Sequence, residues 1–281
     1  MASLFHNYSK PGKGVRKDEK KKKGISLFQE LITRKFWSYM LLNVIYFISA
    51  LPGIILVWFP LYGTLVDLSG ATTEEHFSAL AFFALIISLC ITVVFSLSPL
   101  SSGYYYILRR YTDEEHAWVI GDFFGKFKEN WKKSVIVYVT DVIIIAVCIF
   151  ALRLYILLLP VYSYIAAFIT LFVIALVIYA VMVPYKWIQL VTVDLKLREI
   201  YKNSLFMVLG VLRSTITYIL VSVFYGALLY YLFASAPLYG ILYMILLGFS
   251  VYGLMQAIST YPTVKKFIVE PAKKEYYSEE E

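Results

Sequence analysis

The chain has 281 residues, of which 60% are hydrophobic and only 16% are charged, and its formal net charge is +7. Soluble domains are about 45–50% apolar and about 25% charged, and soluble monomers avoid large exposed apolar patches. The composition therefore excludes a soluble enzyme, a disordered chain and a nucleic-acid-binding domain as leading interpretations, and it indicates an integral membrane protein.

Long apolar runs predict six membrane-spanning helices. A span needs about 20 apolar residues, and the charge-free run 214–264 is long enough for two spans and a turn. The predicted spans are 37–59, 77–100, 134–158, 161–184, 213–233 and 238–260. We therefore expect an all-α membrane protein of three hairpins, with a basic tail over 1–24, a transmembrane domain over 25–263 and a charged tail over 264–281.

The basic residues predict the orientation of these spans. Every lysine and arginine except Arg153 falls before span 1, between spans 2 and 3, between spans 4 and 5, or after span 6. Loops rich in lysine and arginine stay in the cytoplasm. We therefore expect a multi-pass protein of the cell (cytoplasmic) membrane with both termini in the cytoplasm.

The N-terminal tail carries the densest charge, and its core is Lys20, Lys21, Lys22 and Lys23. The spacing of a phosphate-binding loop is absent. A basic segment beside a membrane is attracted to anionic lipid by about 1 kcal/mol per base. The tail is therefore interpreted as a topology determinant held to anionic headgroups, with docking to an acidic cytoplasmic partner as the alternative. No folded reader of nucleic acid accompanies it.

A short amphipathic helix is predicted before the first, third and fifth spans, at about 26–37, 122–134 and 194–204. Each segment places apolar and aromatic residues on one face and bases on the other, which is typical of a helix in the headgroup plane. Ser26 with Gln29 fits a capping box, and Asp122 fits an N-cap. The chain thus resembles three copies of the order short helix, span, span, although any juxtamembrane helix has a similar pattern.

The second of these helices offers a candidate cytoplasmic docking surface. Its members are Phe124, Phe127, Lys128, Asn130 and Trp131.

Asp141 is the one acid inside a predicted span. It lies seven residues past Ser134, about 10 Å from the end of the span. Ionisable residues within a membrane often mark ion or substrate paths. The alternative is a residue hydrogen-bonded to a neighbour such as Asn43, so Asp141 and Asn43 form the candidate intramembrane polar site. The frequent tyrosines near span ends, such as Tyr104 and Tyr230, are interpreted as an aromatic belt.

Catalytic motifs are missing from the sequence. There is no H-E-x-x-H, no G-x-S-x-G and no second intramembrane acid, and the three histidines lie outside the predicted spans. We therefore expect no enzyme activity, no catalytic residue, no metal and no cofactor.

The segments Lys10-Pro11-Gly12-Lys13-Gly14-Val15 and Arg34-Lys35-Phe36-Trp37 resemble the YesL family of bacterial membrane proteins, a family of unknown function. The pattern Phe124-x-x-Phe127-Lys128-x-Asn130-Trp131-x-x-Ser134 is similar to the central motif of that family, and 201–204 is similar to a later counterpart. The resemblance covers most of the chain. It implies a role beside carbohydrate ABC transporters in Gram-positive bacteria, and it implies no catalytic or binding residues.

Two functional hypotheses follow. The first is a non-enzymatic membrane protein that acts as an accessory or regulatory partner of a carbohydrate ABC transporter, with its permease subunits as partners. The second is a small transporter or channel that uses Asp141. A third interpretation, a lipid-organising membrane protein, stays open.

Overall fold

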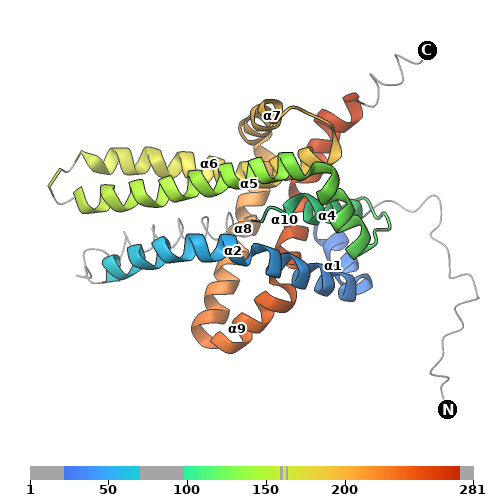
Figure 1. Cartoon of the computed structure of the whole chain (residues 1–281), viewed down its shortest axis with the longest axis horizontal. Coiled ribbons are helices and arrows are strands. Elements are labelled where there is room, and N and C mark those ends of the chain that lie inside the picture. Colours follow the sequence, from blue (N-terminus) through green and yellow to red (C-terminus); the bar gives the residue numbers. More distant parts are fainter. Residues whose placement is uncertain (1–21, 70–97, 159–160, 163, 273–281) are drawn as a thin grey trace, which may run out of the picture.

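The computed structural model describes residues 22–69, 98–158, 161–162 and 164–272, and this part of the chain is built from helices without a strand (Figure 1). In chain order the helices are α1 (Gly24–Arg34), α2 (Phe36–Ser69), α4 (Ser101–Thr112), α5 (Val119–Leu158), α6 (Ile165–Thr192), α7 (Leu197–Gly210), α8 (Leu212–Ser235), α9 (Pro237–Tyr243), the π-helical turn η2 (Met244–Gly248), α10 (Phe249–Val264) and the π-helical turn η3 (Lys265–Val269).

Four of the described helical segments are long and apolar enough to cross a membrane, by length and composition. They are Phe36–Ile55, Ala167–Thr192, Leu212–Phe233 and Pro237–Ala272. The composition and these helices agree on a multi-pass membrane protein. Of the second predicted span, residues 77–97 lie outside the described residues.

The third predicted span and the short helix expected before it form one helix. α5 runs without interruption for 40 residues, whereas the sequence predicts a separate interfacial helix over 122–134. Asp122 does support the start of α5, because its carboxylate accepts a hydrogen bond of 2.9 Å from the Trp118 backbone N–H. The helix therefore begins a turn earlier than predicted and continues into the apolar segment.

The fourth predicted span, 161–184, ends too early. α6 continues to Thr192 with Pro184 inside it, because a proline in an apolar helix is tolerated where neighbouring groups satisfy the freed backbone. Lys186, which the sequence analysis placed in a cytoplasmic loop, therefore lies within the helix.

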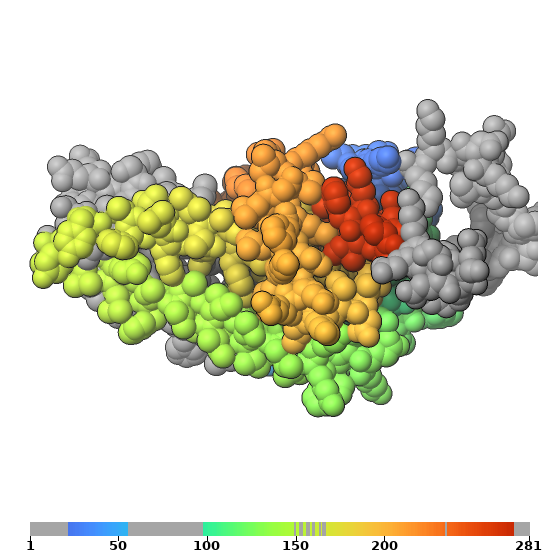
Figure 2. All heavy atoms as spheres, turned by 90° about the horizontal axis from the view of Figure 1, so that it is seen from above, coloured from blue at the N-terminus to red at the C-terminus, as the bar shows by residue number. Residues whose placement is uncertain are grey.

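The hairpins are not parallel copies. α5 and α6 lie side by side along the long axis of the molecule, with α2 beside them, whereas α8 and the α9–α10 segment run across that axis (Figure 1). The same arrangement is visible from above, where the α5–α6 hairpin projects away from the segments around α7 and α8 (Figure 2). The predicted helices before spans 1 and 5 are present as α1 and α7. No side-chain cap precedes α1, so the predicted Ser26 capping box is absent.

A short helix that the sequence analysis did not predict occupies the centre. α4 buries Tyr104, Tyr105 and Leu108, together with most of its other residues. It approaches its neighbours closely at two glycines. A Cβ on Gly103 would lie 2.2 Å from the Phe123 carbonyl oxygen, and a Cβ on Gly253 would lie 1.9 Å from the Tyr104 hydroxyl. A Cβ at Gly103 would overlap backbone, and a Cβ at Gly253 would overlap the buried side chains of Tyr104 and Leu108, so both positions favour glycine.

Candidate functional site

A buried ion pair joins α5 to α6. The Lys186 ammonium donates to Asp141 Oδ1 at 2.5 Å, and both side chains have 0% exposure. The Tyr179 hydroxyl also donates to Asp141 Oδ1, and Lys186 Nζ lies 3.2 Å from that hydroxyl. One carboxylate oxygen thus accepts from two donors on α6, seven residues apart.

Aromatic rings complete the surroundings of the lysine. Lys186 Nζ lies 4.4 Å from the centre of the Tyr179 ring and 5.0 Å from that of Tyr201 on α7. Cations are attracted to the faces of such rings, and more strongly where water is excluded. The second carboxylate oxygen, Asp141 Oδ2, is buried and has no hydrogen-bond partner among the described residues. The Lys186 ammonium group is therefore surrounded by a carboxylate oxygen and two aromatic rings, and Asp141 Oδ2 accepts no hydrogen bond from the described residues.

The structure separates the two residues of the predicted intramembrane polar site. Asn43 of α2 contacts the π-helical turn η2 rather than Asp141. Its amide donates to the carbonyl oxygens of Met244 and Ile245 at 2.9 and 2.7 Å, and its oxygen accepts from the Ser250 N–H at 2.8 Å. A π-turn interrupts the regular i→i−4 ladder of an α-helix. Asn43 therefore compensates the irregular backbone and fixes α2 to the last helical segment.

Lys186 was not predicted from the sequence as the partner of Asp141. The lysine ends a charge-free run, so it resembles the first base of a loop, and it lies 45 positions from the aspartate. The only signal in the sequence was the cost of an unpaired charge in a span, which requires a partner without identifying it.

Several tyrosines that were interpreted as an aromatic belt lie in the core. A buried chain of hydrogen bonds runs from Tyr105 to Gln256 Oε1 (2.8 Å), from Gln256 Nε2 to Tyr218 (3.1 Å), and on to Tyr252 (3.2 Å) and Ser222 (2.9 Å). Tyr230, in contrast, is strongly exposed, as a belt residue would be. Phenolic rings thus serve both to fill the core and to satisfy its polar groups.

An ionic contact ties the end of α4 to the start of η3. Asp113 Oδ1 accepts from Lys265 Nζ at 2.5 Å, and Asp113 Oδ2 accepts from the Tyr261 hydroxyl. Burial acts to raise the pKa of Asp113, but these two hydrogen bonds and the nearby charges of Lys265 and Arg109 outweigh it and lower that pKa. The carboxylate is therefore stabilised in its charged form.

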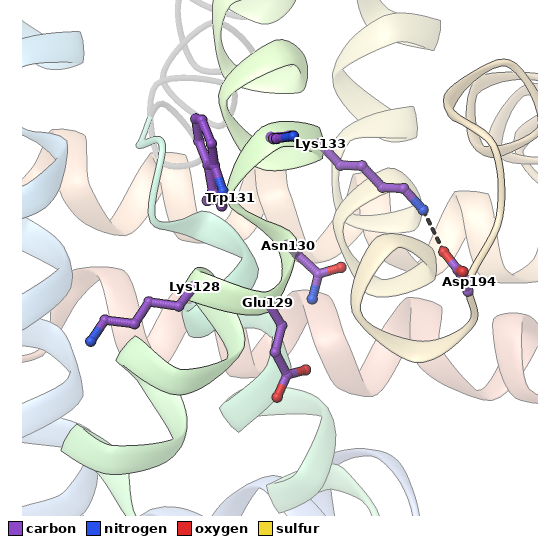
Figure 3. A pocket seen from close by; sticks show the side chains of 7 residues that line it. Lys128, Glu129, Asn130, Trp131, Lys133 and Asp194 are labelled. Atoms are coloured by element: carbon purple, nitrogen blue, oxygen red, sulfur yellow. Dashed lines mark hydrogen bonds and ion pairs between the residues drawn. The ribbon is translucent and has the colours of Figure 1, made fainter.

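An open depression of about 330 Å³ lies over the first half of α5 (Figure 3). Its lining comprises Lys128, Glu129, Asn130, Trp131, Lys132, Lys133 and Asp194. Lys133 reaches across to Asp194, in the loop between α6 and α7, and its ammonium lies 2.5 Å from Asp194 Oδ1. This ion pair connects α5 to the base of α7.

The predicted docking residues divide between two sides of α5. Lys128, Asn130 and Trp131 line the depression, and Lys128 points away from the side of the helix that faces Asp194 (Figure 3). Phe124 and Trp131 are 40% and 52% exposed, whereas Phe127 is half-buried. The set is therefore a region around one helix rather than a single face. Of the basic tail, Lys20 and Lys21 lie outside the described residues, and Lys22 pairs with Glu30 of α1 at 3.0 Å.

Comparison with known proteins gives one match. Residues 77–152 match the family described as "Protein of unknown function, DUF624". No curated protein and no solved structure matches the chain. The matched region contains α4, the depression residues of α5 and Asp141, whereas Lys186 and Asp194 lie beyond it.

Proposed function

We propose that this chain is a non-enzymatic membrane protein of the YesL type that serves as an accessory or regulatory partner of a carbohydrate ABC transporter. The observation that carries the proposal is the open depression on α5, where polar and aromatic side chains remain accessible beside a fixed ion pair. An exposed tryptophan such as Trp131 is typical of the anchors of protein interfaces. The link to carbohydrate uptake rests on the resemblance of the sequence.

The buried state of Asp141 and Lys186 supports an accessory role over transport. Both side chains are fully buried and paired, and neither lines the depression. Transport of a solute requires polar groups that the solute can reach. Docking of a protein partner requires only an accessible surface on a rigid part of the molecule.

The proposal includes six spans with both termini in the cytoplasm of the cell. Four apolar helices support a multi-pass arrangement, and the one-sided distribution of bases supports the orientation. Membrane-impermeant labelling of single cysteines tests it. Cysteines at positions 23 and 270 are expected to stay unlabelled in intact cells, and labelling of either one would contradict the orientation.

Co-purification tests the accessory role. The chain is extracted in mild detergent with its neighbouring permease subunits, and Asn130→Arg is compared with the matched variant Asn203→Arg on α7. We expect Asn130→Arg to lose the permease and Asn203→Arg to keep it, because only Asn130 lines the depression. Purification of the wild-type protein alone, together with unchanged sugar uptake in a deletion strain, would contradict the proposal.

A second candidate function is a small transporter or channel that uses Asp141, and the unpartnered Asp141 Oδ2 favours it. A buried carboxylate oxygen without a donor is a position at which a proton can be accepted. Flux into proteoliposomes that is abolished by Asp141→Asn would support this function. Flux that persists unaltered would remove Asp141 from the mechanism.

A further inference from the structure

One exposed face of α5 changes its chemistry along its length. From Ile136 onward, the exposed large hydrophobic side chains among those that the structure describes include a set at helical spacing: Ile136, Val139, Ile143, Val147, Phe150 and Leu154. Such a stripe is typical of a helix that faces lipid. Lys132 lies one i, i+4 step before Ile136 and shares its face, whereas each further step, to Lys128 and then to Phe124, rotates the position by about 40° more around the helix. Lys128 therefore lies at the edge of the apolar face.

The two lysines on this face differ from the other two lysines of α5. Lys126 pairs with Glu129 at 2.6 Å, and Lys133 pairs with Asp194 at 2.5 Å. Among the described residues Lys128 and Lys132 have no carboxylate within ion-pair distance. Lys132 Nζ lies 5.8 Å from the centre of the exposed Trp131 ring. Two positive charges and an indole therefore remain available at the end of the apolar stripe.

The depth of this cluster matches the headgroup layer. The polar layer on each side of the hydrocarbon core is about 5–8 Å thick. Lys132 lies about 6 Å along the axis from Ile136, within this layer, whereas Lys128 lies about 12 Å from it, beyond the layer, and its long side chain has to extend back toward the membrane to reach the phosphates. Tryptophan prefers this interface, and long basic side chains extend along it.

We propose that Lys128, Trp131 and Lys132 form a binding site for the phosphate of an anionic phospholipid whose acyl chains lie along the apolar stripe of α5. The occupant follows from charge complementarity, since two uncompensated ammonium groups face the layer that contains lipid phosphates. Lys128, Trp131 and Lys132 also line the depression, but the lipid site uses neither Asn130 nor the Lys133–Asp194 ion pair, so a variant at Asn130 separates the two proposals.

Titration of the full-length protein in detergent with dioleoyl phosphatidylglycerol, followed by native mass spectrometry, tests the site. Each base near an anionic surface contributes about a fivefold gain in association. Lys128→Gln with Lys132→Gln is therefore expected to weaken lipid association about thirtyfold, whereas Lys128→Arg with Lys132→Arg keeps it. The matched control Lys126→Gln with Glu129→Gln, which removes a base together with its acid, is expected to bind as the wild type does.

Three outcomes would overturn the site. Equal association of phosphatidylcholine would show that the site does not select a net negative charge. Equal association of inorganic phosphate would show that no acyl chain is needed. Unchanged lipid association in Lys128→Gln with Lys132→Gln, accompanied by loss of a permease subunit, would assign this face to a protein partner instead. Because Asn130→Arg leaves both lysines in place, failure of the docking proposal and failure of the lipid site are distinguishable.

Discussion

At the scale of single residues, the Asp141–Lys186 pair is the most consequential feature of the interior. Removing one member of a buried pair leaves an uncompensated charge, which destabilises by about 3–5 kcal/mol, whereas replacing both members by apolar residues of similar volume is often neutral. Both side chains of the pair are fully buried.

We therefore expect Asp141→Asn to destabilise the protein by about 3–5 kcal/mol. The double variant Asp141→Leu with Lys186→Met should recover most of that loss, because no charge is left in the interior. Unfolding in detergent, followed by circular dichroism, measures both. A single variant within about 0.5 kcal/mol of the wild type would show that the pair is not buried in the folded state.

Asn43 stabilises the fold through its backbone contacts at η2. Asn43→Ala removes three hydrogen bonds and leaves the buried Ser250 N–H without its side-chain acceptor. Each buried group left unsatisfied costs about 1–3 kcal/mol, so the unfolding free energy should fall by at least that amount. Ser49→Ala on the same helix, at a half-buried position, serves as the control and should cost less. Equal losses in the two variants would contradict a specific role for Asn43 at the π-turn.

At the scale of elements, the packing of α4 depends on two glycines. A Cβ on Gly253 would overlap the Tyr104 hydroxyl and approach Leu108 Cδ1 to 2.7 Å. Overpacking of this kind costs about 1–3 kcal/mol. Gly253→Ala should therefore lower the melting temperature of the purified protein.

Gly125 offers the matched control, because a Cβ there meets no atom within 4 Å. Alanine is favoured over glycine in a helix interior by about 0.5–1 kcal/mol, so Gly125→Ala should be neutral or stabilising. Equal melting temperatures of Gly253→Ala and Gly125→Ala would contradict a close α4–α10 contact at Gly253.

The sequence predicts the elements better than it predicts their ends. α1, α7 and α8 lie near their expected positions, because amphipathic spacing and apolar runs are local properties. The true ends of α5 and α6 depend on tertiary partners. α6 continues past Pro184 and so places Lys186 beside Asp141. No local sequence pattern predicts a partner 45 positions away.

The candidate site was predictable to a similar degree. Asp141 is recognisable in the sequence because it is an isolated charge in an apolar run. Asn43 is recognisable only as a polar residue, and its partners cannot be predicted because they are backbone groups of residues 244, 245 and 250. The burial of α4 was hidden for the same kind of reason. Its tyrosines and serines resemble an interfacial loop, and only the long-range contacts to Phe249 and Gln256 reveal a core helix.

At the scale of the whole molecule, the contact of Asp113 with Lys265 and Tyr261 joins parts of the chain that are about 150 positions apart. The pKa of Asp113 is lowered in the folded protein. Its contribution to stability is therefore fully present above the ordinary aspartate pKa of about 3.9 and is lost as the pH falls through the lower pKa of the folded state.

The melting temperature of Asp113→Asn should therefore lie below that of the wild type at pH 7, and the difference should close under strong acid. Parallel melting curves from pH 7 to pH 2 in one detergent measure it. A difference that stays constant over this range would show that the charge of Asp113 does not contribute, and that only its shape matters.

The unbroken length of α5 couples its two ends. From Asp141 to Leu158 the helix rises about 26 Å, close to the hydrocarbon thickness of about 30 Å. Lys128 and the ion pair are therefore fixed on one rod, and neither can change its depth without the other. A change in acyl-chain length would therefore create a hydrophobic mismatch along the whole α5–α6 hairpin. We expect the tilt of this hairpin to depend on the thickness of the membrane.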